Sequence, residues 1–472
     1  MKHQRSTVLP LGLALVLAIA PALPAQNIPQ TSGQNPALGS VPDGKATPEV
    51  LALTLSGAMD RALKQNLGVL YGSDAVLAAQ GQRVQERSQL LPNLSARMSE
   101  AAEQVNLAAQ GFEKIAGRFP GFPLMVGPFG YFDLRAYLSQ TLLDLTALHT
   151  DRAARSSISA EQFSYQNARE TVALVVGAMY LDALTAAARV DAAQSEVQTA
   201  QALQQQAANL RQAGVSAGID VLRAEVELQT RQQELIAARN ALAKQYLVVA
   251  RVIGLPLDQQ FRLADDVPYQ AAPAPAVSDS VGRALASRPD FQSAQQQVNS
   301  AEEQRRAATA ERLPSLAASA DYGVNGPRPT ETHGSYTAGA SLRIPIFAGN
   351  KAHGDALVAQ SQLDRNRQRL EDLRAQIEQD VRTASLDLQA ASEQVAVARS
   401  SVDLAQQTLA QSRDRFGAGA TNNIEVVQAQ DALARANESY IESVHDYNLA
   451  RMRLARATGT AEKDIRLYGK EK

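Results

Sequence analysis

The residues best placed by type and spacing to do chemistry are two histidines, His149 and His353, which follow similar alternating segments in the two halves of the chain. In an assembly of three copies, six such histidines would gather at one level and could bind a metal ion. Histidines without cysteine or close carboxylate partners are more often structural, so the pattern favours a structural role. The sequence also has no GxxxxGK[ST], HExxH or GxSxG motif. It therefore predicts no enzyme, no cofactor and no metal site.

The composition of the 472 residues narrows the class of protein further. Lysine and arginine total 46 and aspartate and glutamate 48, so the formal net charge is −2 and nothing indicates a basic face for nucleic acid. Cysteine is absent, which excludes disulfides, thiolate chemistry and an N-terminal lipidated cysteine. Alanine and glutamine are frequent, and aromatic residues make up only 5%. Because Ala and Gln favour helices and Ala fills a large core poorly, we expect long, thinly packed helices.

An export signal is predicted at the N-terminus, over residues 1–25. The basic start MKHQR is followed by an apolar run over residues 8–20 and by small residues, with cleavage expected between Ala22 and Ala25. That run is short for a membrane-spanning helix, which needs about 20 residues, so cleavage is favoured over anchoring. Residues 26–47 are rich in Gln, Pro, Gly and Ser and are expected to form a disordered linker.

The chain repeats itself in the same order over most of its length. At an offset of 222 positions, Arg61 matches Arg283 and Leu91-Pro92 matches Leu313-Pro314, and at an offset of 205, Ala213-Gly214 matches Ala418-Gly419. The difference of 17 residues indicates an insertion in the first copy, near residues 100–130. Ala- and Gln-rich helices resemble each other trivially, but the matched Pro and Gly positions argue against chance.

Each copy reads as a helical segment, two short strands and a helical hairpin. The assignments are a first repeat at 48–255 (strands about 92–142, hairpin 145–253), a connector at 256–276, a second repeat at 277–459 (strands about 313–347, hairpin 350–458) and a tail at 460–472. In the second copy, Pro289 follows Arg288 and is expected to open a new helix.

Hydrophobic residues recur every seven positions along the predicted hairpins. The series in the second long helix is Val381, Leu388, Val395, Val402, Leu409 and Phe416. This spacing is typical of helices that pair as left-handed coiled coils. A helix of about 67 residues would extend roughly 100 Å at 1.5 Å per residue, so it is expected to stand beside other long helices.

The predicted strands alternate between an apolar and a polar face. In the last strand, Tyr336, Ala338 and Leu342 fall on one side, while Thr337 and Arg343 fall on the other. An ordinary half-buried sheet alternates in the same way. In an exported protein, however, strands of about ten residues with this pattern are typical of outer-membrane β-barrels. Because a barrel needs about eight strands, four per chain predict an oligomer with a shared barrel of eight or twelve strands.

The order of these elements resembles the TolC family of outer-membrane efflux and secretion channels of Gram-negative bacteria. The motifs that carry the resemblance are the Leu-Pro before each first strand, RPD at 288–290, IPIFAGN at 344–350 and RFGAGATNNIEVVQAQ at 415–430. The resemblance spans roughly residues 50–460. It implies a mainly α fold with β, in a homotrimer whose shared 12-stranded outer-membrane barrel continues as a long periplasmic α-helical coiled-coil barrel.

The resemblance also implies a function and partners. Such a channel is a passive conduit that works with a periplasmic adaptor (membrane fusion) protein and an inner-membrane pump, in tripartite efflux or type I secretion. The adaptor would dock at the two helix–turn–helix tips, Arg211–Asp220 and Arg415–Glu425. The docking positions are Ala213, Gly214, Val215, Ala418, Gly419 and Ala420. Gly214 and Gly419 are expected to take the positive φ that ends a helix.

The resemblance places a periplasmic gate near the same tips. Asp220 and Glu425 match acidic gate positions, and Phe416 matches an aromatic one. Thr421 stands where the family has a gate arginine, and Gln428 stands at a further acidic position, so this chain departs from the ionic latch of its relatives. A carboxylate in the first turn of a helix also favours the helix dipole, which is the alternative role for the two acidic residues.

A periplasmic coiled-coil adaptor or scaffold is the alternative class of protein. Adaptors usually have one helical hairpin and a compact β-rich domain, whereas this chain has two copies, each with a strand pair. Fractionation separates the two classes, because an adaptor stays with the inner membrane or periplasm and a channel stays in the outer membrane.

Overall fold

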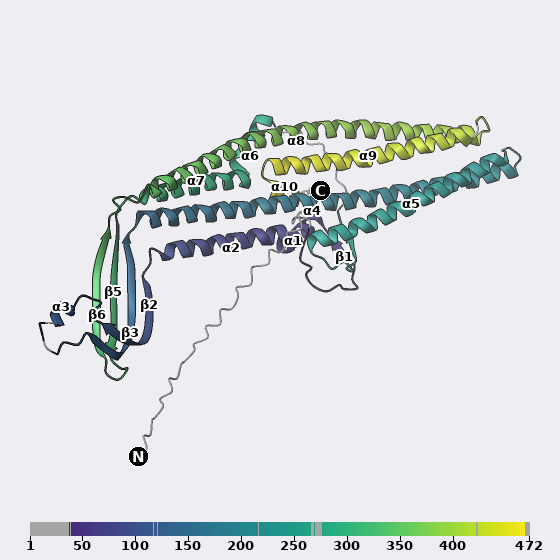
Figure 1. Ribbon diagram of the computed structural model, residues 1–472. Helices are drawn as coiled ribbons and strands as arrows, with labels where there is room; N and C mark the ends of the chain where they lie inside the picture. Colours follow the sequence, from purple (N-terminus) through teal and green to yellow (C-terminus); the bar gives the residue numbers. More distant parts are fainter. Residues whose placement is uncertain are drawn as a thin grey trace, which may run out of the picture. The chain divides into compact units, whose positions relative to one another are not determined.

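A computed structural model describes most of the chain from Ala37 onward (Figure 1). The described residues are 37, 39–116, 118–119, 121–215, 217–265, 269, 276–421 and 423–467. The predicted signal peptide at 1–25 and the first part of the predicted linker lie outside the described residues.

Long helices make up most of the structure and occur in the same order in the two halves of the chain. They are α1 (Leu55–Gln65), α2 (Leu67–Ser88), α4 (Leu145–Gln212), α5 (Gly218–Ile253), α6 (Val277–Ser287), α7 (Pro289–Ala310), α8 (Lys351–Gly417), α9 (Asn423–Ala457) and the short α10 (Ala461–Leu467). Helices α4 and α5 form one hairpin and α8 and α9 form the other (Figure 1). Val381, Leu388 and Val395 are buried along α8, so the seven-residue spacing correctly predicted which face packs.

The first helical segment of each half is broken at equivalent positions. Pro289 opens α7, as predicted, and Arg288 is the extended residue before it. Asn66, which lies 222 positions earlier, breaks α1 from α2 in the same way, and the sequence analysis missed this break. Asn66 is fully buried, its Oδ1 accepts from the Gly68 N–H at 2.9 Å, and its Nδ2 donates to the Ala37 carbonyl at 2.9 Å. The side chain therefore satisfies the backbone groups that the break leaves unpaired.

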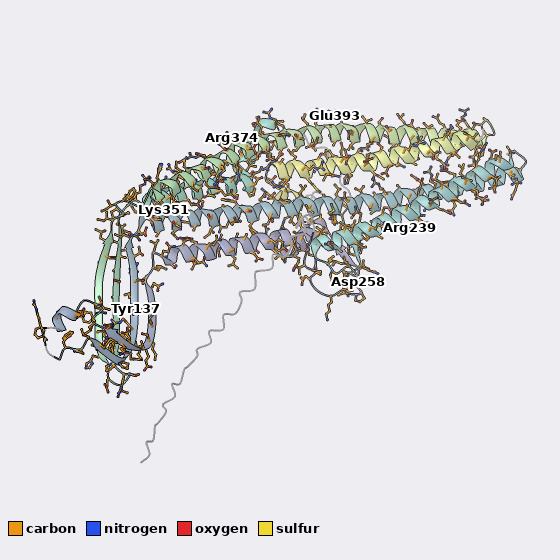
Figure 2. All side chains as sticks on the ribbon, in the orientation of Figure 1. Tyr137, Arg239, Asp258, Lys351, Arg374 and Glu393 are labelled. Atoms are coloured by element: carbon orange, nitrogen blue, oxygen red, sulfur yellow. The ribbon has the colours of Figure 1, made fainter. Side chains whose placement is uncertain are left out.

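In each half of the chain, two strands separate the first helical segment from the hairpin, and the four strands together form one antiparallel sheet. Its strands are β2 (Asn93–Asn106), β3 (Met125–Leu143), β5 (Ser315–Gly326) and β6 (His333–Arg343), in the order β2-β3-β5-β6. Strand β3 leads directly into α4, where Asp144 caps the helix by accepting the Ala147 N–H at 3.1 Å. Strand β6 leads to α8, which begins at Lys351 (Figure 2). The sheet is thus covalently continuous with the long helix of each hairpin.

The register of the strands gives the sheet one apolar and one polar face, as the alternation predicted. Leu94 pairs with Leu138, and Tyr322 pairs with Tyr336. This face is uncovered, with Leu94 74% and Tyr336 79% exposed. On the opposite face, Arg135 forms ion pairs with carboxylates and donates to Ser335 Oγ at 2.7 Å. Contiguous apolar surface of this kind indicates contact with lipid or with another protein.

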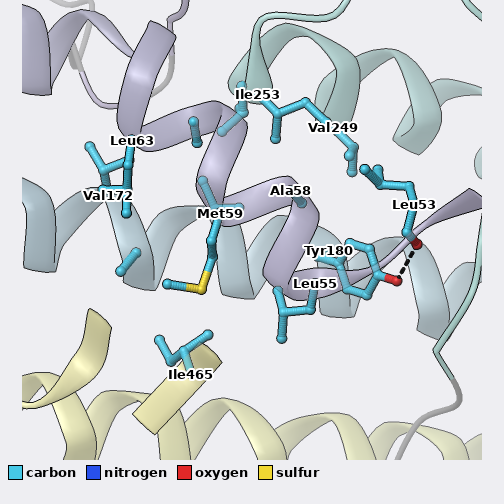
Figure 3. Close-up of a cluster of buried hydrophobic side chains, with 14 of the residues drawn as sticks. Leu53, Leu55, Ala58, Met59, Leu63, Val172, Tyr180, Val249, Ile253 and Ile465 are labelled. Atoms are coloured by element: carbon cyan, nitrogen blue, oxygen red, sulfur yellow. Dashed lines mark hydrogen bonds between the residues drawn. The ribbon is translucent and has the colours of Figure 1, made fainter. Parts of the chain in front are cut away.

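The largest apolar core lies where α1, α5 and α10 pack on the middle of α4 (Figure 3). Two short strands border it, β1 (Leu51–Leu53) and β4 (Phe261–Leu263), which pair in parallel. Tyr180 of α4 is buried there, and its hydroxyl lies 2.8 Å from both the Leu53 carbonyl and Asp265 Oδ2. An 18-residue window of α4 has a mean hydropathy of 1.7, and 56% of it is buried inside the structure. We interpret this window as a core helix.

Two segments differ from the sequence expectations. Within the predicted disordered linker, residues 39–47 pack on the helices: Val41 N–H donates to the Gln65 carbonyl at 2.9 Å, and Thr47 N–H donates to Gln259 Oε1 at 2.8 Å. These partners are distant in sequence, so composition alone could not reveal them. The insertion near residues 100–130, to which the sequence analysis assigned no helix, contains a short helix, α3 (Glu113–Ala116).

Candidate gate and docking tips

The turn between α4 and α5 is a Schellman motif built around Gly214. Gly214 has φ +75° and donates its N–H to the Arg211 carbonyl at 3.0 Å, while Val215 N–H donates to the Leu210 carbonyl at 2.9 Å. These two bonds satisfy carbonyls at the end of α4 that would otherwise lack a partner. The positive φ predicted for Gly214 is confirmed.

The turn between α8 and α9 has the same construction around Gly419, whose φ of +72° confirms the prediction for this glycine also. Gly419 N–H donates to the Phe416 carbonyl at 3.0 Å, and Ala420 N–H donates to the Arg415 carbonyl at 2.9 Å. A Cβ placed on Gly419 would lie 3.8 Å from Val215 Cγ1, so the two tips lie side by side (Figure 1).

All six predicted docking positions lie on these two turns and are exposed. They are Ala213, Gly214, Val215, Ala418, Gly419 and Ala420. Val215 is 60% exposed, so one apolar side chain is accessible at the tip. Together the turns present small side chains and one apolar side chain on a rigid backbone.

Among the predicted gate residues, Thr421 and Glu425 contact each other directly. The Thr421 hydroxyl donates to Glu425 Oε2 at 2.6 Å, and Arg415 Nη1 lies 3.2 Å from Glu425 Oε1. Arg415 precedes the turn, so this arginine and Glu425 form an ion pair within one hairpin. The threonine at the family's arginine position therefore supports the carboxylate by a hydrogen bond rather than by charge.

Asp220 lies in the first turn of α5 and is only 8% exposed. Its Oδ1 lies 3.6 Å from Arg223 Nη1, and its backbone carbonyl accepts from Asn423 Nδ2 at 3.1 Å. Asn423, at the start of α9, is fully buried. This contact joins the two hairpins at their tips through a residue that the sequence analysis did not single out.

Phe416 is 3% exposed and packs inside the hairpins rather than projecting from them. Its apolar cluster takes residues from α4, α8 and α9: Leu203, Leu409, Phe416, Val426 and Ala429. The aromatic ring therefore joins the first hairpin to the second as a packing residue. The heptad series that ends at Phe416 was the sequence signal for this role.

The two histidines considered as metal ligands lie in separate contacts near the sheet. His149 Nδ1 lies 2.7 Å from Glu303 Oε2 on α7, and His353 Nδ1 lies 3.5 Å from Arg312 Nη2. In the described part of the chain, no group of three or more His, Asp or Glu side chains is placed to hold a metal ion.

Solved structures with this arrangement of sheet and paired hairpins are outer-membrane channels. The outer membrane protein VceC from Vibrio cholerae matches with a TM-score of 0.72 at 16% identity, over 86% of this chain and 96% of that one. The MtrE outer membrane channel of Neisseria gonorrhoeae matches with a TM-score of 0.71 at 18% identity, over 86% and 89% of the two chains. The fold is therefore that of an outer-membrane channel subunit.

Sequence comparisons find similarity to outer membrane efflux and secretion proteins. The family model described as outer membrane efflux protein matches residues 281–460. The alkaline protease secretion protein AprF of Pseudomonas aeruginosa is 25% identical over 345 residues, 70% of each chain. The outer membrane efflux protein BepC of Brucella suis is 24% identical over 339 residues, 69% of this chain and 72% of the other. These similarities support the resemblance to the TolC family, since the matched model and the relatives are described as efflux, secretion or channel proteins.

Proposed function

We propose that the chain is one subunit of a homotrimeric outer-membrane channel that conducts cargo passively from an inner-membrane pump, across the periplasm, to the outside. The channel works in a tripartite efflux system or a type I secretion system. The observation that carries the proposal is the uncovered apolar face of a sheet whose strands continue into two long helical hairpins. Similarity to outer membrane efflux proteins supports a location in the outer membrane of a Gram-negative bacterium.

The number of strands supports a shared barrel. Four strands are too few to close a barrel, since about eight are the minimum, and three chains supply twelve. Within the described residues, β2 and β6 each pair with one neighbour, so each chain offers two free edges. Closure between copies removes those edges, which would otherwise leave backbone groups unpaired in lipid. The exposed Leu94 and Tyr336 then face lipid.

The hairpins support a periplasmic tube with an adaptor at its end. Coiled pairs from three chains, arranged around one axis, continue the barrel away from the membrane. The exposed turns at Gly214 and Gly419 dock the periplasmic adaptor protein, and the gate residues Asp220, Phe416, Thr421 and Glu425 lie just behind them. The two copies of the strand pair and hairpin derive from an internal duplication.

The adaptor alternative is disfavoured by the relatives. AprF and BepC are named as a secretion protein and an outer membrane efflux protein, and the solved neighbours are outer-membrane channels over most of their length. An adaptor would also leave the apolar face of the sheet without a lipid partner.

Conductance across a planar lipid bilayer tests the channel. The detergent-purified full chain should run as a trimer and give discrete conductance steps. A water-soluble monomer that gives no steps would overturn the proposal.

A pair of proline variants tests the docking turns. Gly419→Pro removes an N–H bond and forces φ away from +72°, so adaptor binding and export should fail while the trimer still forms. Gly111→Pro is the matched control, because Gly111 has φ +86° and donates its N–H to Ala108 in the loop between β2 and β3. Export that survives Gly419→Pro would place the docking site elsewhere.

A further inference from the structure

A row of polar contacts joins helix α4 of the first hairpin to helix α9 of the second, and its steps are seven residues apart on both helices. Going away from the tips, the positions are Glu196 and Asp431, which both contact Arg231, then the pair Arg189 and Glu438, then the pair Asp182 and His445. We call these six residues the inter-hairpin seam. Helices α4 and α9 lie next to each other over this stretch (Figure 1).

Two of the three steps join complementary side chains directly. Arg189 Nε donates to Glu438 Oε1 at 2.8 Å, and His445 Nε2 lies 2.8 Å from Asp182 Oδ1. The arginine and glutamate are about half exposed, so solvent screens their attraction. These steps align the two helices without holding them strongly.

The positions nearest the tips, Glu196 and Asp431, differ from the other two pairs because both residues are acidic. Glu196 of α4 and Asp431 of α9 both contact the guanidinium of Arg231, from α5. Arg231 Nη1 lies 3.6 Å from Glu196 Oε2, and Nη2 donates to Asp431 Oδ1. A third helix thus supplies the charge that this step of the seam lacks.

Arg231 also contacts two carboxylates of its own helix. Its Nε donates to Glu227 Oε1 at 2.7 Å, and Nη1 donates to Glu234 Oε2 at 2.9 Å. One guanidinium, only 8% exposed, therefore holds four carboxylates from three helices. Burial raises the pKa of the Glu196 carboxyl, Arg231 opposes that rise, and the neighbouring acids add to it. The cluster carries more negative than positive charge even with Arg231 in place.

We propose that Arg231 is the positioning residue that holds the tip halves of the two hairpins together, and that the resting closure of the channel depends on it. The proposal rests on the channel function proposed above. Without Arg231, four carboxylates face one another in a partly buried space and repel. The ion pairs of Glu425 with Arg415 and of Asp220 with Arg223 stay within single hairpins, so they do not replace this connection.

The test compares two arginines of α5 that differ in what they join. Arg231→Gln removes the charge between the hairpins. Arg239→Gln is the matched control, because Arg239 (labelled in Figure 2) is exposed and donates to Gln194 Oε1 at 2.7 Å within its own hairpin. In planar bilayers, Arg231→Gln should raise the open probability by roughly tenfold or more, a factor that corresponds to about 1.4 kcal/mol. Arg239→Gln should match the wild type.

Two further variants separate charge repulsion from simple loss of structure. Arg231→Lys keeps the charge but loses the planar fork, so its open probability should lie between wild type and Arg231→Gln. The triple variant Arg231→Gln/Glu196→Gln/Asp431→Asn removes the opposed charges as well and should return toward wild-type closure. A trimer-forming Arg231→Gln channel that stays as closed as Arg239→Gln, or a triple variant as open as the single one, would overturn the proposal. Absence of conductance in every protein, wild type included, would instead overturn the channel function.

Discussion

Replacing Phe416 with alanine tests whether the tips are held closed by apolar packing. Phe416 is 3% exposed and lies with Leu203 of α4 and Val426 of α9 in one cluster. The ring therefore contacts both hairpins close to the turn at Gly419. Removing it leaves a cavity that the surrounding helices fill only in part.

The free-energy cost of Phe416→Ala follows from the burial of the phenylalanine side chain. Truncation of a buried phenylalanine to alanine costs about 3–5 kcal/mol. The tips are the ends of long hairpins, so this loss lowers the free energy of local opening there and leaves the distant core around Tyr180 intact. At about 1.4 kcal/mol for each factor of ten, tip amides should exchange hydrogen roughly a hundred- to several-thousandfold faster.

Hydrogen exchange of the detergent-purified full chain, read by mass spectrometry on peptides from 405–430, measures this change. Leu404→Ala is the matched control, because Leu404 lies on the same helix and is 61% exposed; its effect should stay within about 0.5 kcal/mol. Equal exchange at the tip in Phe416→Ala and Leu404→Ala would refute the packing role of Phe416 and favour a projecting gate residue.

Two further predictions concern the helical body. The hydrogen bond that the His445 imidazole donates to Asp182 raises the pKa of His445 above its usual 6.5 against the opposing effect of burial. The contact therefore stabilises the fold fully below about pH 6.5 and loses that effect as the pH rises through the raised folded value. His445→Gln should therefore cost on the order of 1 kcal/mol at pH 6 and little at pH 9, measured by unfolding at both; an equal cost at both would contradict it. The imidazole contacts Asp182 and Asp446, and Arg189 and Glu442 line the same pocket. Tyr180→Phe removes a hydroxyl that lies 2.8 Å from the Leu53 carbonyl and from Asp265 Oδ2, and should destabilise the chain by about 1–3 kcal/mol, whereas an unchanged melting temperature would show that these acceptors find other donors.

The sequence predicted well those features that depend on residues close together along the chain. The seven-residue series ending at Phe416 identified the packed face of α8, and single residues such as Gly214 and Pro289 predicted a turn conformation and a helix start. The break at Asn66 escaped prediction because asparagine within an apparently helical segment is a weak signal. It breaks the helix through buried contacts with Ala37 and Gly68.

Contacts between the hairpins were not predictable, because they depend on the register of α4 against α9. The sequence shows that Asp431 and Glu196 each lie in a helix, but only the relative positions of two helices more than 200 residues apart bring both within reach of Arg231. The same holds for Asn423, whose amide reaches the Asp220 carbonyl. The spacing of residues along the chain therefore predicts each hairpin, whereas the contacts between the hairpins can be identified only in the folded structure.

The two acidic gate residues differ in how readily each could serve a neighbouring subunit. Both lie in the first turn of a helix, where a carboxylate favours the dipole, so position alone does not separate a capping role from a gate role. Asp220 is almost buried and holds Asn423 through its carbonyl, so movement of its turn would disturb the contact between the hairpins. Glu425 pairs with Arg415, whose side chain is 60% exposed, and such exposed pairs contribute about 0–1 kcal/mol. Glu425 can therefore exchange this partner at little cost, which makes it the better candidate for a gate contact between subunits, whereas Asp220 is better explained by its role within the chain.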